Sequence, residues 1–97
     1  MLTKDQAIKF MAYRVLMMEQ ANTLEDLYTL EEMAVNDLNY ISRQRVMQPV
    51  EVGTERRRVE ATTNHRAGEL EREAMASKNV CLALDRMMRP AAAGGAQ

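Results

Sequence analysis

The chain has 97 residues, a net charge of −1 and 46% hydrophobic residues. This length allows one compact domain, and the near-zero net charge argues against binding of polyanions by bulk charge. Its hydrophobic residues are mostly Ala, Leu, Met and Val, and four Gly and two Pro are the main turn formers. An all-β fold, which needs many strand formers and turn residues, is thereby excluded, and an all-α protein is predicted.

The N-terminal segment and the single cysteine bear on location and cofactors. Lys4, Asp5 and Lys9 precede the apolar part of the segment, and no small-residue cleavage site follows, so a signal peptide is not expected. Apolar runs such as residues 15–18 are far shorter than the ~20 residues that span a membrane. Cys81 alone allows neither an intrachain disulfide nor a multi-thiolate metal site. We therefore expect a soluble, cytoplasmic protein without metal, cofactor or membrane partner.

A first helix is predicted at about residues 4–21. Thr3 and Gln6 form a capping-box pattern, and Asp5 suits the first turn of a helix. Apolar residues then recur at helical spacing at Ile8, Met11, Val15 and Met18, beside a second row at Phe10, Met17 and Ala21. Two rows predict a helix that is covered over much of its circumference.

A second helix is predicted at about residues 24–46. Asn22 and Thr23 supply N-cap chemistry, and two acidic residues follow them. This pattern fits either a tight turn or a kink between the first two helices. One face of the second helix carries Leu27, Leu30, Ala34, Leu38 and Ile41.

A loop at 47–54 and a third helix at 55–89 complete the predicted domain. Pro49 and Gly53 indicate the loop, and Thr54 is the predicted cap of the third helix. Pro90 ends that helix, so the single helical domain covers 1–89 and the tail 90–97 is predicted to be disordered.

The third helix has two unlike halves. The second half carries a heptad seam, which we define by its residues with alternating spacings of 4 and 3: Ala67, Leu70, Ala74, Ser77, Cys81, Leu84 and Met88. Before Ala67 the apolar residues are few, Val59 and Ala61 among them. The first half is therefore expected to bury little, and the seam is expected to pack.

Three consecutive arginines are the first candidate site. Guanidinium groups bind phosphates and carboxylates through paired hydrogen bonds, so Arg56, Arg57 and Arg58 are possible anion ligands. Consecutive helical residues lie ~100° apart, which spreads the three side chains around the helix. Glu55 and Glu60 also lie at ion-pairing distance along the sequence. The preferred interpretation is a solvated helix start.

His65, Arg66 and Cys81 are further candidate site residues. Histidine is a common general base, and His65 has Glu69 at helical spacing, but no nucleophile or second histidine lies beside it. Arg66 and His65 join the three arginines as possible anion ligands. Cys81 lies in the seam, where a small packed residue is more plausible than a reactive thiol.

Nine methionines in 97 residues are the most informative composition feature. Met adapts to irregular surfaces, so Met-rich faces suit helices that bind other helices, although Met also fills gaps in small cores. No paired carboxylates, metal-ligand spacing or activated nucleophile indicates an enzyme. The sequence thus predicts two to three amphipathic helices in a helical hairpin or small bundle, completed by self-association, most simply as a symmetric dimer.

The predicted function is that of a non-enzymatic interaction protein of adaptor, chaperone or inhibitor type. It would bind itself and another protein through apolar helix faces, with packing or interface positions at Met11, Val15, Met18, Leu27, Leu70, Ala74, Leu84 and Met88. The alternative is an oligomeric anion-binding protein, in which the arginines 56–58, His65 and Arg66 hold a nucleotide, a cyclic nucleotide or nucleic-acid phosphates. A third interpretation is one subunit of a hetero-oligomer.

Overall fold

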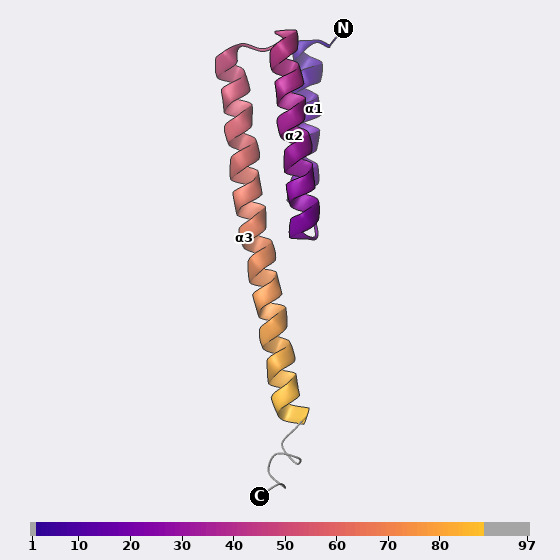
Figure 1. Cartoon of the computed structure of the whole chain (residues 1–97), viewed down its shortest axis with the longest axis vertical. Helices are drawn as coiled ribbons and strands as arrows, with labels where there is room; N and C mark the ends of the chain where they lie inside the picture. The colour runs from indigo at the N-terminus through magenta and orange to yellow at the C-terminus, as the bar shows by residue number, and fades with distance from the viewer. Residues whose placement is uncertain (1, 89–97) are drawn as a thin grey trace, which may run out of the picture.

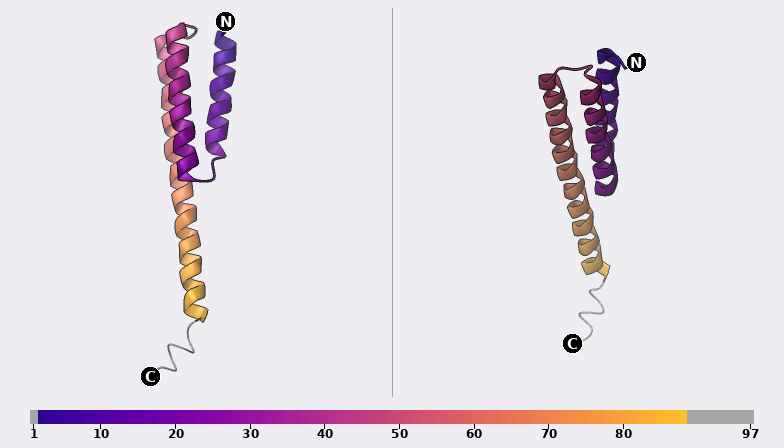
Figure 2. Two further views of the ribbon diagram at one scale, coloured as in Figure 1. Left: turned by 45° about the vertical axis from the view of Figure 1, so that its right-hand side comes forward. Right: turned by 45° about the horizontal axis from the view of Figure 1, so that its top comes forward.

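The computed structural model describes residues 2–88, which form three α-helices. Helix α1 spans Lys4–Glu19, α2 spans Leu24–Gln44 and α3 spans Pro49–Met88. Antiparallel helices α1 and α2 form a hairpin that packs along the first part of α3, and the rest of α3 extends alone (Figure 1, Figure 2). The predicted all-α small bundle is confirmed. Arg89 and the tail 90–97, predicted to be disordered, lie outside the described residues.

Both hairpin helices begin at threonine caps. The Thr3 hydroxyl accepts a hydrogen bond from the Gln6 backbone at 3.2 Å, and the Gln6 side chain accepts one from the Thr3 backbone at 2.9 Å. The Thr23 hydroxyl accepts from the Asp26 backbone at 3.1 Å. Each cap satisfies amide groups that have no partner inside the helix. Of the two alternatives left open between the first helices, the structure has the tight turn.

Helix α3 begins at Pro49, inside the predicted loop 47–54, and the connection from α2 covers only residues 45–48. This corrects the predicted start at 55. Proline was interpreted as a helix breaker, but it suits the first helical position because an amide there needs no helical partner. The Glu51 carboxylate accepts a hydrogen bond from the Gln48 amide at 2.8 Å, which completes the helix start.

Thr54, the predicted cap, lies inside α3 instead. Its hydroxyl donates to the Val50 carbonyl at 3.0 Å, one turn earlier in the helix. On the other side of the connection, Arg45 adopts the left-handed conformation with φ of 55°, which ends α2 and turns the chain. A connection this short forces α3 to start beside the end of α2, as an antiparallel neighbour.

The core lies where the three helices meet. Six of its side chains are large and almost fully excluded from solvent, namely Met11, Met18, Leu27, Leu38, Ile41 and Val59. The remaining members are Ala7, Val15, Ala21, Ala34, Met47, Val52 and Leu70. Methionine therefore fills part of the core, as one of the two interpretations of the Met-rich composition expects.

The structure corrects the expectation for the first half of α3, which was predicted to bury little. The first, more polar half is packed, with Val52, Glu55, Val59 and Thr63 buried against the hairpin. Every residue of 71–88 is exposed, and we call this stretch the projecting segment. A few apolar residues are enough for packing when they all lie on one side of the helix. The number of apolar residues is therefore a poor guide to which half of α3 is buried.

Glu55 was expected at a solvated helix start, but only 6% of it is exposed. Its Oε2 atom lies 3.4 Å from Nη1 of Arg58, the ion pair that the sequence spacing suggested, and makes no hydrogen bond. Burial of a carboxylate with one loose partner is unfavourable, so its packing neighbours must hold it in place.

An ion pair between Lys4 and Glu51 joins the starts of α1 and α3. The hydrogen bond from Lys4 and the bond from the Gln48 backbone lower the pKa of Glu51. Since the folded state holds the proton less tightly than the unfolded chain, the stabilisation is present above the unfolded pKa and is lost as the pH falls through the folded pKa.

We predict that Glu51→Gln lowers the free energy of unfolding at neutral pH and that this difference from wild type shrinks in acid. Because the carboxylate must be charged to act, both proteins should converge below the pKa of Glu51. Urea unfolding at a series of pH values measures the difference. Lys4→Gln should reproduce the pH dependence, whereas a difference that is constant from neutral pH into acid would contradict this role of the pair.

A second prediction tests the core. Leu38→Ala should reduce the free energy of unfolding by ~2–5 kcal/mol, because it removes a fully buried side chain and leaves a cavity. Leu82→Ala is the matched control, since Leu82 lies on the projecting segment and is 48% exposed, and should change stability by less than ~0.5 kcal/mol. Equal losses in urea unfolding would show that the projecting segment contributes to the core.

Candidate interaction site

The face with which α3 contacts the hairpin continues past the end of the hairpin. Inside the bundle this face carries Val52, Val59, Thr63 and Leu70. Steps of three and four residues then lead along the heptad seam through the projecting segment, from Ala74 to Met88. In the projecting segment the seam therefore lies on this same side of α3. There, α1 and α2 no longer cover it.

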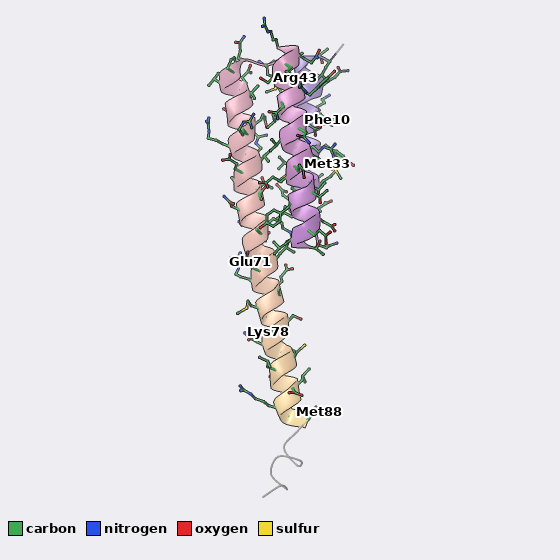
Figure 3. All side chains as sticks on the ribbon, in the orientation of Figure 1. Phe10, Met33, Arg43, Glu71, Lys78 and Met88 are labelled. Carbon is green, nitrogen blue, oxygen red and sulfur yellow. The ribbon has the colours of Figure 1, made fainter. Side chains whose placement is uncertain are left out.

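Large apolar side chains widen this uncovered face. Val80 is 58% exposed, Leu84 53%, Met87 72% and Met88 83%. The seam residues between them are small, which leaves the helix backbone accessible along Ala74, Ser77 and Cys81. Figure 3 shows the lower half of α3, with Lys78 and Met88 labelled, extending beyond the other two helices. Uncovered apolar surface of this kind marks interaction sites in soluble proteins.

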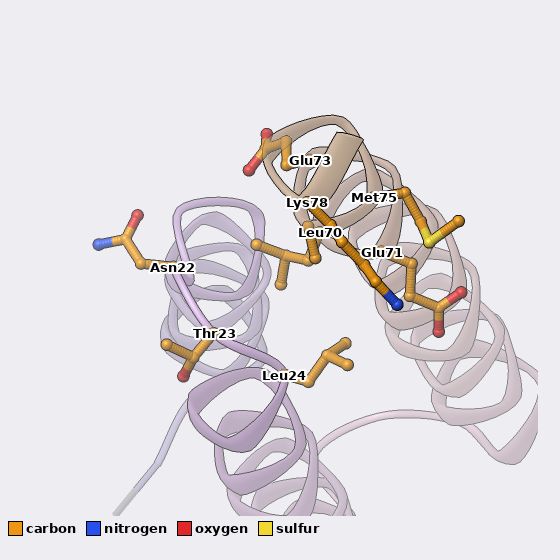
Figure 4. A pocket seen from close by; sticks show the side chains of 9 residues that line it. Asn22, Thr23, Leu24, Leu70, Glu71, Glu73, Met75 and Lys78 are labelled. Atoms are coloured by element: carbon orange, nitrogen blue, oxygen red, sulfur yellow. The ribbon is translucent and has the colours of Figure 1, made fainter. Parts of the chain in front are cut away.

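An open notch of about 750 Å³ lies where the hairpin ends and α3 continues. Its walls are the α1–α2 turn on one side and the start of the projecting segment on the other, with Leu24 and Leu70 between them (Figure 4). The complete lining is Asn22, Thr23, Leu24, Leu70, Glu71, Glu73, Ala74, Met75 and Lys78. The notch thus joins the seam to the end of the bundle.

Arg66 fastens the hairpin to α3 just above the notch. Its Nε atom donates to the Ala21 carbonyl at 2.9 Å, and Nη1 lies 3.4 Å from Glu69 and 3.8 Å from Glu73. The side chain is only 15% exposed. Because its donors are used within the chain, Arg66 acts here as a structural residue that positions the α1–α2 turn.

The other proposed anion ligands do not converge with Arg66 or with one another. Arg56 lies 3.3 Å from the Asn39 side chain, Arg57 lies 3.3 Å from the Thr54 hydroxyl, and Arg58 pairs with Glu55. His65 is 76% exposed and lies 3.8 Å from Glu69, at the spacing noted in the sequence. Within residues 2–88, these cations therefore do not form one common anion site.

The predicted packing or interface positions fall into two groups. Met11, Val15, Met18, Leu27 and Leu70 lie in the core of one chain, where they contact their own helices. Ala74, Leu84 and Met88 are exposed on the projecting segment. The first group therefore packs the bundle, and the second group remains accessible to another molecule.

A groove between α1 and α2 is a second apolar surface, which sequence reasoning missed. Arg14 bridges the groove through a 2.7 Å hydrogen bond to Asp37 and lies 5.1 Å from the Phe10 ring. Hollows of about 190 Å³ beside Phe10 and Tyr40 and about 320 Å³ beside Met17 flank this bridge. Residues 14 and 37 come together only after the hairpin folds, so no local pattern announces them.

The described residues contain neither a candidate metal site nor a membrane-spanning helix, and the chain has no match among the known proteins compared with it. Among residues 2–88, no three His, Cys, Asp or Glu side chains are grouped to hold a metal ion. None of the helices in this range combines the length and apolarity that a membrane span needs. Comparisons with protein-family models, with curated proteins and with solved structures gave no match.

We predict that Arg66→Gln lowers the free energy of unfolding by ~1–3 kcal/mol, because a charge-assisted hydrogen bond to the carbonyl of the buried residue Ala21 is lost. Arg57→Gln, on the exposed side of α3, is the control and should cost less than ~0.5 kcal/mol. Urea unfolding measures both. If the two substitutions have equal effects, Arg66 does not anchor the turn.

Proposed function

We propose that this chain is a small non-enzymatic helical interaction protein that self-associates through the projecting segment of α3. The observation that carries the proposal is the apolar face of α3, which is covered by the hairpin as far as Leu70 and is uncovered from Ala74 to Met88. An apolar helix face in water is stabilised when another surface covers it, at about 25 cal/mol for each Å² that is buried.

The state of the projecting segment supports the same proposal. Most helical stability in proteins comes from packing of one face of the helix. The projecting segment gains no such packing from its own chain, since all of its residues are exposed. A docking partner would supply that stabilisation, so association and helix formation should be coupled.

We propose that a further protein binds in the α1–α2 groove. This groove remains accessible when the seam of α3 is covered, because its two hollows are lined by residues of α1, α2 and the segments beside them. Phe10 and Tyr40 at one end and Met17 and Leu30 at the other offer apolar contacts at helical spacing. The kind of partner that fits is a helical segment with apolar residues at the same spacing.

We predict that Leu84→Glu raises the dissociation constant of the self-associated form by ~10-fold or more. Placing a carboxylate in an apolar contact costs at least ~1.4 kcal/mol, which corresponds to a factor of ten. Sedimentation equilibrium over a range of protein concentrations measures the mass and the constant. Leu82→Glu is the matched control, because two residues along a helix rotate the side chain by ~200°, which turns residue 82 away from the side that carries Leu84.

Two outcomes of this experiment would count against the proposal. A wild-type mass that stays at 11.1 kDa at every concentration would contradict self-association. Equal weakening by Leu84→Glu and Leu82→Glu would show that the seam is not the contact surface.

A further inference from the structure

We infer that the notch at the end of the hairpin binds a basic amphipathic helix of another protein, with apolar residues on one side and Lys or Arg beside them. The notch lies where the projecting segment leaves the hairpin, and it is separate from the α1–α2 groove. Its partner is defined by two properties of the surface, namely the helix packing that the notch continues and the charge around it.

A helix fits the notch because α3 already packs against a helix directly above it. There α2 lies along α3, and Arg56 of α3 is 3.3 Å from the Asn39 side chain of α2. Helix α2 begins at Leu24, which lies in the notch together with Leu70 (Figure 4). The backbone of α3 is hydrogen-bonded within its own helix, so it offers no strand edge to an extended chain. An added helix would therefore continue the line of α2 along α3.

The notch offers an apolar contact to such a helix. Leu24, Leu70, Ala74 and Met75 are four of the residues that line it, and Met75 is 59% exposed. Apolar side chains that cover these residues are stabilised by the area that they remove from water. The flexible Met75 side chain adapts to the shape of the partner. The partner therefore needs apolar residues at steps of three and four, which form one side of a helix.

Carboxylates outnumber cations around this end of the bundle. Residues 19–26 and 66–78 together contain six Asp or Glu and three Lys or Arg. Two of the carboxylates, Glu71 and Glu73, line the notch itself. Glu73 is 66% exposed and lies 3.8 Å from Arg66, whereas Glu71 has no ion pair within residues 2–88. The rim of the notch is therefore acidic.

Two of the three cations in these ranges are not directed at the notch. Arg66 is 15% exposed, and its donors are used within the chain. Nη1 of Arg72 lies 3.4 Å from the position that a Cβ atom of Gly68 would take, and neither residue lines the notch. Among the described lining residues, Lys78 is the one cation. A partner with Lys or Arg beside its apolar residues complements the excess of negative charge, and an acidic partner is repelled.

Three designed peptides of about 15 residues test this inference on the full chain. The Lys peptide has Leu at steps of three and four with Lys beside them. The Glu peptide has Glu in place of Lys, and the Ser peptide has Ser in place of Leu. Fluorescence anisotropy of each labelled peptide during titration with the protein gives its dissociation constant.

We expect the Lys peptide to bind at least ~10-fold more tightly than either of the other two at low salt. The advantage over the Glu peptide should shrink at ~1 M salt, where charges farther apart than ~3 Å are screened. Equal binding of the Lys and Glu peptides would overturn the inference, because charge would not select the partner. Equal binding of the Lys and Ser peptides would also overturn it, because the apolar residues of the notch would not contribute.

Glu71→Lys should weaken binding of the Lys peptide by ~5-fold, because it replaces an attraction at the notch with a repulsion. Glu32→Lys is the matched control. It makes the same change of charge at an exposed position of α2, eight residues beyond Leu24, and should change the dissociation constant by less than ~2-fold. Circular dichroism checks that both variants keep the helix content of the wild type.

Two further results would overturn the inference. Equal effects of Glu71→Lys and Glu32→Lys would place the peptide outside the notch. Anisotropy that falls again at high protein concentration would show that a second copy of the chain displaces the peptide. Self-association is measured separately by sedimentation equilibrium without peptide, so a failure of the notch to bind the Lys peptide is distinguishable from a failure of the proposed function.

Discussion

The length of the hairpin relative to α3 is the constraint on which the rest of the structure depends. Helix α2 has 21 residues and α3 has 40, and the connection between them is short. An antiparallel helix can cover only as much of its neighbour as its own length, about 31 Å for α2. The packed part of α3 therefore ends near Leu70, and the remainder of the helix has no partner within the chain.

Much of the fold could be predicted from local chemistry. The capping box at Thr3 and Gln6 and the cap at Thr23 were correct, because cap preferences arise from side-chain hydrogen bonds within one turn. The start of α3 was missed because proline has two opposite effects in helices, which depend on its position. Only the hydrogen bonds around Gln48 and Glu51 show which effect applies.

The packing of α3 could not be predicted by counting apolar residues. The first half seemed too polar to pack, yet Val52 and Val59 suffice because topology places them against α2 and α1. The heptad seam has the spacing of a packed face, yet topology leaves its part beyond Leu70 uncovered by the other described helices. The short connection between α2 and α3 would have predicted this packing, because a loop of a few residues makes the two helices that it joins antiparallel neighbours.

The candidate site divides in the same way between local and tertiary information. The seam positions Ala74, Leu84 and Met88 follow from heptad spacing alone, whereas the notch and the α1–α2 groove exist only after the hairpin folds. Arg66 links the two levels. The sequence groups Arg66 with other cations as a possible anion ligand. In the structure its Nε atom donates a hydrogen bond to the carbonyl of Ala21 instead.

This hydrogen bond also shapes the surface at the end of the hairpin. The bond from Arg66 to Ala21 ties the α1–α2 turn to α3, and the turn forms one wall of the notch. The notch lies where the covered face of α3 meets its uncovered continuation. One part-buried guanidinium therefore helps to position the surface beside the projecting segment.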